Sequence, residues 1–334
     1  MIVADDLTEL IGHSPVLRVN TARPDWDLFL KLESFNPSGS FKDRTAWGLI
    51  SAAEERSLCK PGTTLVESSS GNTAKALAML AAARGYEFIA VVDKHAPADK
   101  LNAIRVFGGK LHFCADEDDP GGGHLVDVRR ETAKRLAAEI PGAVNLDQYD
   151  NPDNPLGYYR SLGPELLEQV PRIDFFVGTI GTGSSLSGTA RYLKEHGKTT
   201  VIALEPKGSA HYSPRGHGYF ISGPGYPPGA KLPKNIDHSV IDLHDSVSDA
   251  QAFNTMRYFA SKKGLLMGDS GGMVAYYAMK YIGGTEPGRE RKTMVLLVGD
   301  GGESYLSHAF NETWMIENEL LEPRVEMELA AFYG

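Results

Sequence analysis

The chain alternates short apolar runs with helix-like segments along most of its length. The alanine-rich segment 73–84 is typical of a helix that ends at Gly85, and Ser248 with Gln251 matches the capping box of a helix ending before Gly264. Apolar runs bounded by turn residues, which predict buried strands, cover 28–32, 63–67, 88–92, 175–178, 201–205 and 294–298. Strands separated by helices are typical of parallel sheets with helices on both faces. The sequence therefore predicts an α/β protein with mainly parallel sheets.

Length, charge and cysteine content exclude several classes of protein. A chain of 334 residues can bury a large core and favours two domains. Its net charge of −9 argues against a nucleic-acid partner, which requires a basic surface. Cys59 and Cys114, the only cysteines, do not suggest a disulfide framework or a metal site. No run approaches the ~18 consecutive apolar residues of a membrane span, and the first residues lack the features of a signal peptide, so we expect a cytoplasmic protein.

One lysine stands where a reactive amine would be held in place. Lys42 lies in a glycine- and serine-containing loop, residues 36–44, between the expected strand 28–32 and a helix. That helix is predicted by the spacing of its apolar residues, Ala46, Leu49, Ile50 and Ala53. A lysine that forms a Schiff base needs a fixed position and partial desolvation, which make its amine nucleophilic. Lys42 is therefore our first candidate catalytic residue.

A second motif, residues 67–73, joins a predicted strand to a predicted helix. Its candidate binding residues are Ser69, Ser70, Gly71, Asn72 and Thr73. Hydroxyls and free backbone N–H groups at a helix N-terminus bind carboxylates well. The alternative is a polar turn in which a serine or asparagine caps the helix and binds no ligand.

A third motif follows the predicted strand 175–178 and opens a helix. It consists of Gly181, Thr182, Gly183, Ser184 and Ser185. Glycines let the backbone approach an anion, and N–H groups with hydroxyls can surround a phosphate. The dinucleotide fingerprint does not fit, because Leu186 stands where its third glycine would be, and the lysine of a Walker motif is also missing. We therefore expect a cradle for a single phosphate.

A fourth motif, residues 268–272, matches the G-x-S-x-G pattern of a nucleophile elbow with Ser270 at its centre. Residues 265–267 would be the strand before it, and Asp300 and His308 follow in the order of a hydrolase triad. A serine hydrolase would leave the other three motifs unexplained. We keep it as a remote alternative.

Two irregular stretches and one boundary complete the organisation. Residues 116–123 are acidic and then glycine-rich, and predict a surface loop. Residues 211–233 are rich in glycine and proline and too long for an ordinary connection, which suggests an active-site loop or lid. The asparagine- and proline-rich segment 148–155 is expected to separate two halves that each carry a sheet.

With these motifs in this order, the chain resembles the cysteine synthase/cystathionine β-synthase family of fold-type II pyridoxal-phosphate enzymes. The likeness runs from residues 10–15 (LIGHSP) to 300–306 (DGGESYL). It implies two three-layer α/β domains with mainly parallel sheets, of the tryptophan synthase β type. The N-terminal domain would span 35–150, with a mobile subdomain at about 76–146, and the other would combine 1–34 with 151–334. The resemblance also implies a homodimer.

The resemblance assigns roles to the candidate residues, with pyridoxal 5'-phosphate as the cofactor. Lys42 would be the internal aldimine lysine and the proton shuttle at the substrate α-carbon. Asn72 would bond the ring hydroxyl, Ser270 would face the pyridine nitrogen, and Gly181 to Ser185 would hold the phosphate. Ser69, Ser70, Gly71, Asn72, Thr73 and Gln148 would hold the carboxylate of an amino-acid substrate.

The implied activity is β-replacement on an O-activated L-serine, O-acetyl or O-phospho, through an aminoacrylate. One alternative uses an amino-acid amine as the nucleophile and makes a 2,3-diaminopropionate precursor for siderophores or antibiotics. It is suggested by local features at 91–93, 119–125 and 311–314, with Arg129 and Arg130 near the expected phosphoserine site. A serine/threonine dehydratase and a non-catalytic relative are further alternatives. A glycine run in the phosphate loop is typical of dehydratases, whereas residues 181–185 favour β-replacement.

Three departures from the family pattern leave the substrates open. Lys75 follows the 69–74 segment and either is solvated or reads an anionic substrate group. Tyr158 replaces a common histidine, and residues 222–233 form a proline-rich variant of the usual substrate loop. These changes affect the expected substrate and nucleophile, and leave the expected cofactor unchanged.

Overall fold

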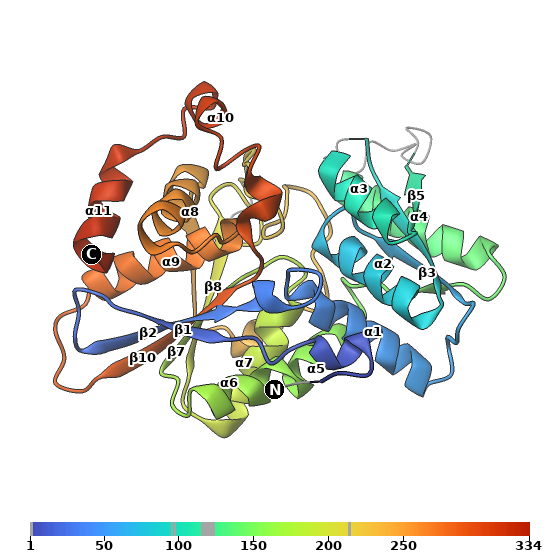
Figure 1. Ribbon diagram of the computed structural model, residues 1–334, viewed down its shortest axis with the longest axis horizontal. Coiled ribbons are helices and arrows are strands. Elements are labelled where there is room, and N and C mark those ends of the chain that lie inside the picture. Colours follow the sequence, from blue (N-terminus) through green and yellow to red (C-terminus); the bar gives the residue numbers. More distant parts are fainter. Residues whose placement is uncertain (1–2, 95, 97, 115–123, 213–214) are drawn as a thin grey trace.

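The computed structural model describes residues 3–94, 96, 98–114, 124–212 and 215–334, and its named strands form two sheets (Figure 1). The six-stranded sheet has the order β1 (Val16–Val19), β2 (Trp26–Leu32), β10 (Lys292–Val298), β7 (Phe175–Thr179), β8 (Thr200–Pro206) and β9 (Leu243–Val247). The four-stranded sheet has the order β5 (Lys110–Phe113), β4 (Glu87–Val92), β3 (Thr64–Ser68) and β6 (Val144–Asn145). All strand pairs except β1 with β2 are parallel, which confirms the predicted class. The expected loop at 116–123 lies outside the described residues.

Helices cover both faces of each sheet, so that each half has three layers (Figure 1). Four helices belong to the half that contains the four-stranded sheet. They are α1 (Lys42–Glu55), which precedes the sheet in the chain, α2 (Asn72–Arg84), α3 (Ala98–Val106) and α4 (Leu125–Glu139). Those around the six-stranded sheet are α5 (Asp153–Arg160), α6 (Leu162–Gln169), α7 (Ser184–His196), α8 (Asp249–Lys263), α9 (Asp269–Gly283), α10 (Glu312–Glu317) and α11 (Pro323–Tyr333). Short 3-10 helices are η1 (Leu7–Leu10), η2 (Glu33–Phe35), η4 (His238–Val240) and η5 (Gly302–Tyr305). None of the helices within the described ranges is long and apolar enough to cross a membrane.

The core follows the alternation of side chains along the strands. Leu28 and Leu30 of β2 pack with α8, α9 and α11 on one face of the large sheet, whereas Phe29 packs with the cluster of α5, α6 and α7 on the other. On the four-stranded sheet, Leu65 packs under α1 and α2, and Val66 packs under α4. Burial on both faces explains why the consecutive residues 28–30 of β2 and 65–66 of β3 are all apolar.

The helix boundaries agree with the expected signals, whereas one predicted strand is not formed. Both hydrogen bonds of the Ser248–Gln251 capping box are present, and Gly264 ends α8 in the left-handed conformation (φ 66°). The predicted apolar face of α1 is buried. The predicted strand at 265–267 was wrong: only Met267 forms a single bridge, with Gly301. The N–H of Leu265 donates to the Phe259 carbonyl of α8, and α9 begins at Asp269, so only the two bonds of the bridge form. They run from the Gly302 N–H to the Leu266 carbonyl and from the Gly268 N–H to the Asp300 carbonyl.

Candidate active site

A cavity of about 580 Å³ lies at the carboxyl ends of β3 and β7, where the two halves meet. The carboxyl edge of a parallel sheet is where α/β proteins bind ligands, since the loops after the strands converge there. All predicted site residues except Gly183 and Ser184 line this cavity: Lys42, Ser69, Ser70, Gly71, Asn72, Thr73, Gln148, Gly181, Thr182, Ser185 and Ser270. The structure therefore brings together motifs that are far apart in the sequence.

Lys42 is the first residue of α1, and its ammonium lies 5.0 Å from the centroid of the Phe41 ring. Desolvation lowers the pKa of this ammonium to about 8, against the opposing attraction of the Glu67 and Asp300 carboxylates. A lower pKa increases the neutral fraction of the amine, which is the form that attacks a carbonyl carbon.

The backbone around Lys42 is held from two sides. The N–H of Phe41 donates to the Gly299 carbonyl at 2.8 Å, and the Tyr158 hydroxyl donates to the Phe41 carbonyl at 2.8 Å. Tyr158 is fully buried and also lies 2.9 Å from the Thr45 hydroxyl. The residue that departs from the family's histidine therefore helps to position the lysine. The sequence shows this departure but not its role, because Tyr158 is more than 100 residues away in sequence from both of its partners, Phe41 and Thr45.

The Ser/Asn motif leaves the start of α2 open to the cavity. Gly71 is the N-cap, and no side chain caps the helix, so the alternative of an ordinary capped turn does not hold. The N–H groups of the first helical turn then lack helical partners and can bind an anion. Gln148 is fixed beside them, because it accepts from the Thr73 hydroxyl at 2.8 Å and donates to the Ser68 carbonyl at 3.0 Å.

The turn from 181 to 185 joins β7 to α7 and has the shape of a cradle. Gly183 has a φ of 86°, and no side chain caps α7. A Cβ on Gly183 would lie 2.4 Å from Ile236 Cγ1, and one on Gly181 would lie 2.6 Å from the Gly223 carbonyl oxygen. The Ser184 hydroxyl is buried and has no hydrogen-bond partner among the residues that the structure describes. A buried unpaired hydroxyl at a helix N-terminus fits a phosphate oxygen.

Replacing Gly183 with alanine should weaken the retention of a bound phosphate group at least about tenfold, or ~1.4 kcal/mol. The left-handed backbone alone costs about 1–3 kcal/mol for a residue with a Cβ, and Ile236 must also move. Equilibrium titration with pyridoxal phosphate measures the change. Gly62→Ala is the matched control, because Gly62 has a φ of 88° and open space around its Cβ position. Equal losses in both variants would contradict the cradle.

Ser270 lies in the first turn of α9, where Gly299 approaches it so closely that a Cβ there would be 3.0 Å from its hydroxyl. Among the described residues, none of its hydrogen bonds involves a histidine. His308 is exposed, contacts Ser307 and packs edge-on against Trp314. The triad needed by the serine-hydrolase alternative is therefore not assembled.

Sequence analysis also missed a polar cluster beside Ser270. Asn72 donates to Asp300 at 2.8 Å, and the Tyr305 hydroxyl contacts Asp300 and Asp269. The sequence predicts a role for Asp300 only in the hydrolase alternative. Its position at the end of an apolar strand was the available signal, but its partners are up to 228 residues away.

The remaining basic candidates have defined places. Lys75 is not part of the cavity wall, and its ammonium lies near Gly39. Burial raises the pKa of Asp43 to about 6, and the positive charge of Lys75 acts to lower that pKa. Arg129 lines the cavity and pairs with Asp93. Arg130 is buried outside the cavity wall and pairs with Asp150 at 2.8 Å.

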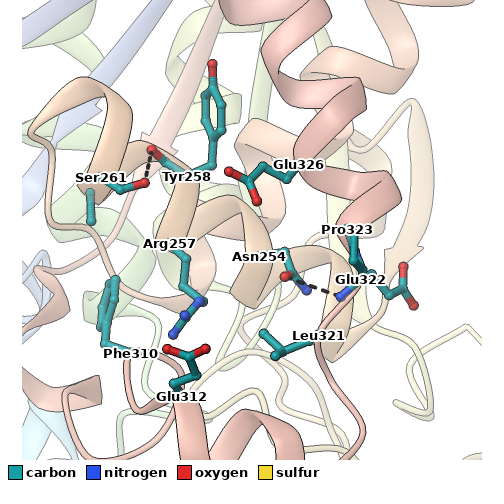
Figure 2. A pocket seen from close by; sticks show the side chains of 11 residues that line it. Asn254, Arg257, Tyr258, Ser261, Phe310, Glu312, Leu321, Glu322, Pro323 and Glu326 are labelled. Carbon is teal, nitrogen blue, oxygen red and sulfur yellow. Dashed lines mark hydrogen bonds between the residues drawn. The ribbon is translucent and has the colours of Figure 1, made fainter.

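A second cavity, of about 640 Å³, lies between α8 and residues 310–326 (Figure 2). Asn254 and Arg257 of α8 and Glu312 and Leu321 of the C-terminal segment line it. It contains none of the predicted site residues, and we assign it no role.

Known proteins resemble the chain over most of its length. Residues 7–300 match the model of the family described as "Pyridoxal-phosphate dependent enzyme". The chain belongs to the cysteine synthase/cystathionine β-synthase family of pyridoxal-phosphate-dependent enzymes. It is 42% identical to a "Putative cysteine synthase" of Sinorhizobium fredii (strain NBRC 101917 / NGR234), over 97% of this chain and 95% of that protein. It is 34% identical to cystathionine beta-synthase of Apis mellifera, over 98% of this chain and 65% of that longer protein.

Solved structures extend the likeness. The crystal structure of O-ureido-L-serine synthase superimposes with a TM-score of 0.84 at 32% identity, over 93% of this chain and 96% of that chain. A hydrogen sulfide-producing enzyme from Fusobacterium nucleatum gives a TM-score of 0.83 at 28% identity, over 91% of this chain and all of that chain. The family prediction, the fold-type II prediction and the predicted cofactor are confirmed.

The residues of the cavity fit pyridoxal phosphate as a group. The 181–185 cradle with its unpaired Ser184 hydroxyl suits the phosphate. Lys42 offers an amine of lowered pKa, and Asn72 and Ser270 offer polar groups in the same cavity. This donor set matches the aldehyde, the hydroxyl and the ring nitrogen of that cofactor.

Proposed function

We propose that the protein catalyses β-replacement on an O-activated L-serine, with an acetyl or phosphoryl leaving group. The observation that carries the proposal is the shared cavity of Lys42, the open N-terminus of α2 and the 181–185 cradle. The likeness to cysteine synthases and to O-ureido-L-serine synthase supports it.

In this proposal the chain's own residues bind, orient and move protons. When bound, pyridoxal phosphate supplies an electron sink for charge that develops at the substrate α-carbon. Lys42 takes the proton from that carbon and later returns one. The N–H groups and hydroxyls of residues 69–73, with Gln148, hold the substrate carboxylate. Asn72 and Ser270 orient the cofactor ring, and Gly181 to Ser185 hold its phosphate.

The larger-scale organisation belongs to the same proposal. We propose that residues 35–150 form one domain, that 1–34 with 151–334 form the other, and that about 76–146 moves as a subdomain over the substrate. Such closure would exclude water from a hydrolysis-prone intermediate. We also propose a homodimer.

The deciding experiment offers the purified protein O-acetyl-L-serine and O-phospho-L-serine in turn, and measures released acetate or phosphate. Sulfide, thiols and amino acids are then tested as nucleophiles by mass spectrometry of the product. Pyruvate formed without any nucleophile would indicate a dehydratase, and an amine adduct would indicate the diaminopropionate branch. If neither donor loses its leaving group, β-replacement on these donors is wrong.

A further inference from the structure

Two carboxylates, those of Asp269 and Asp300, are buried in the same wall of the active-site cavity. Asp269 is the first residue of α9 and is 1% exposed, and Asp300 follows β10 and is 6% exposed. The Tyr305 hydroxyl lies 3.3 Å from Asp269 Oδ1 and 2.9 Å from Asp300 Oδ2. A hydroxyl carries one proton, so Tyr305 can donate to only one of the two carboxylates at a time.

The other donors around the pair are fixed. Asp269 accepts from the N–H of Ser222 at 2.6 Å and from that of Ser270 at 2.7 Å. Asp300 accepts from the Asn72 amide at 2.8 Å. Two buried carboxylates that share one hydroxyl cannot both be ionised at low cost, so near neutral pH the pair holds one proton in common.

Several charged groups face the pair from neighbouring elements. Lys100 of α3 contacts the Ser222 hydroxyl at 3.2 Å, lies 5.9 Å from the Tyr305 ring centroid, and attracts both carboxylates. Lys42 of α1 interacts with Asp300, and Glu303 of η5 repels it. Burial, followed by repulsion from Asp300, raises the pKa of Asp269 to about 7, and burial also raises the pKa of Asp300.

From this geometry we propose that the Asp269–Asp300 pair accepts the proton of the incoming nucleophile. The inference rests on the proposed function and narrows its second substrate to a neutral or cationic nucleophile that still carries a proton. The negative charge of the pair disfavours the binding of a preformed anion such as hydrosulfide. The same carboxylates can accept a hydrogen bond, and then the proton, from an N–H, O–H or S–H group of the nucleophile. Lys42 is then left for the α-carbon.

The proposed step conserves protons and electrons. The bond from the nucleophilic atom to hydrogen breaks, and the proton moves to the ionised carboxylate of the pair. The electron pair stays on the nucleophilic atom and forms the new bond to the β-carbon that the leaving group has vacated. The π bond between the α- and β-carbons breaks at the same time, and its electron pair moves to the α-carbon. Lys42 supplies the proton that the α-carbon gains, and the acid pair later releases its own proton to solvent.

Two nitrogen nucleophiles test the proposal. 1,2,4-Triazole is neutral and must lose an N–H proton when it adds, whereas azide is an anion without a proton to lose. We expect Asp269→Asn to slow triazole addition by about 10²-fold or more, the usual contribution of a general base. Azide addition should change little or become faster, because the variant has one carboxylate fewer to repel the anion. Both rates are measured by rapid mixing with donor-loaded enzyme and normalised to leaving group released.

Asp249→Asn is the matched control. Asp249 is likewise the first residue of a helix, α8, and accepts from the N–H groups of Phe220 and Ile221 at 3.0 and 2.8 Å. It does not line the cavity, so this variant should leave both rates unchanged. An equal loss for triazole and azide in Asp269→Asn would overturn the proposal.

A pH profile provides a readout that a purely structural role would not move. Above about pH 7 the pair loses its shared proton and offers two ionised carboxylates instead of one, so triazole addition should rise with pH through that value, and azide addition should not. Tyr305→Phe removes a donor that stabilises the ionised form of Asp300. The inflection in the pH profile of triazole addition should therefore move to higher pH. An unmoved inflection would contradict the shared-proton geometry.

Infrared difference spectra of the cofactor-free protein separate this inference from the proposed function. A carboxylic-acid band should disappear as the pH rises through about 7, and should be missing or displaced in Asp269→Asn. If no donor loses its leaving group, the proposed function fails, and the spectrum still decides whether the pair holds a proton. A spectrum without such a band overturns the inference even in an active enzyme.

Discussion

Lys42→Ala should abolish the visible absorption that arises when pyridoxal phosphate is covalently linked to the protein. Lys42 lines the same cavity as the 181–185 cradle, and its pKa is lowered to about 8 by desolvation. Alanine offers no amine for the cofactor aldehyde and no base for the substrate α-carbon. The loss of a general base alone costs about 10²–10⁴-fold in rate, so turnover of the donor should fall by at least that factor.

Two measurements check this result. The absorption spectrum is recorded after reconstitution, and borohydride reduction followed by peptide mass spectrometry locates the modified lysine. Lys75→Ala is the control, because Lys75 is outside the cavity wall and should leave the band intact. A persistent band in Lys42→Ala, with the label on another lysine, would contradict the assignment.

Arg44→Met should lower the free energy of unfolding by about 3–5 kcal/mol, the usual cost of leaving a buried charge without its partner. Arg44 Nε lies 2.7 Å from Glu33 Oε2, and its Nη2 lies 2.9 Å from Glu165 Oε2. Glu33 is fully buried, and Lys31 also pairs with Glu165. The substitution leaves Glu33 without the guanidinium that compensates its charge.

The pH dependence of the variant should be opposite in sign to that of the wild type. Burial alone would raise the pKa of Glu33, but the Arg44 guanidinium, together with the Ser14 hydroxyl and Lys31, outweighs it and the pKa is lowered. The ionised Glu33 therefore stabilises the wild type above the ordinary carboxylate range, and this stability is lost on acidification. Without Arg44 the pKa should be raised, so the variant should gain stability as Glu33 takes up a proton in mild acid.

Denaturant unfolding at neutral and mildly acidic pH measures both effects. Arg18→Met is the matched control, because Arg18 pairs with Asp27 at the surface and its side chain is 56% exposed. Exposed pairs contribute about 0–1 kcal/mol, so this variant should unfold nearly as the wild type does. A loss for Arg44→Met within that range would show that the network does not stabilise the fold. Because Arg44 lies in the first turn of α1, the variant should also loosen Lys42.

The site was predictable where each motif is continuous in sequence. Lys42 at a helix entrance, the polar turn before α2 and the glycine turn before α7 each combine a ligand-binding group with a local backbone signal. The strand at 265–267 was predicted wrongly, because this segment is a short link between the end of α8 and the start of α9 and pairs through a single bridge.

Contacts between distant segments could not be predicted in the same way. Tyr158 reaches Phe41 across 117 residues, and Asn72 reaches Asp300 across 228. Nothing in the local sequence of either partner indicates the other. The Glu33–Arg44–Glu165 network was missed for the same reason. Charged residues are usually exposed, and the burial of these three depends on the tertiary packing that brings η2, α1 and α6 together.

By itself the sequence determined the α/β class, the family and the cofactor, because periodicity and short motifs are local properties of the chain. Only the tertiary structure decided which polar groups share the cavity and how their protons are distributed. Parallel strands bring loops from distant parts of the chain to one edge, and burial there changes the pKa values of Lys42 and Asp269 in opposite directions. Desolvation disfavours whichever form is charged, so it favours a neutral amine and a protonated acid in the same cavity.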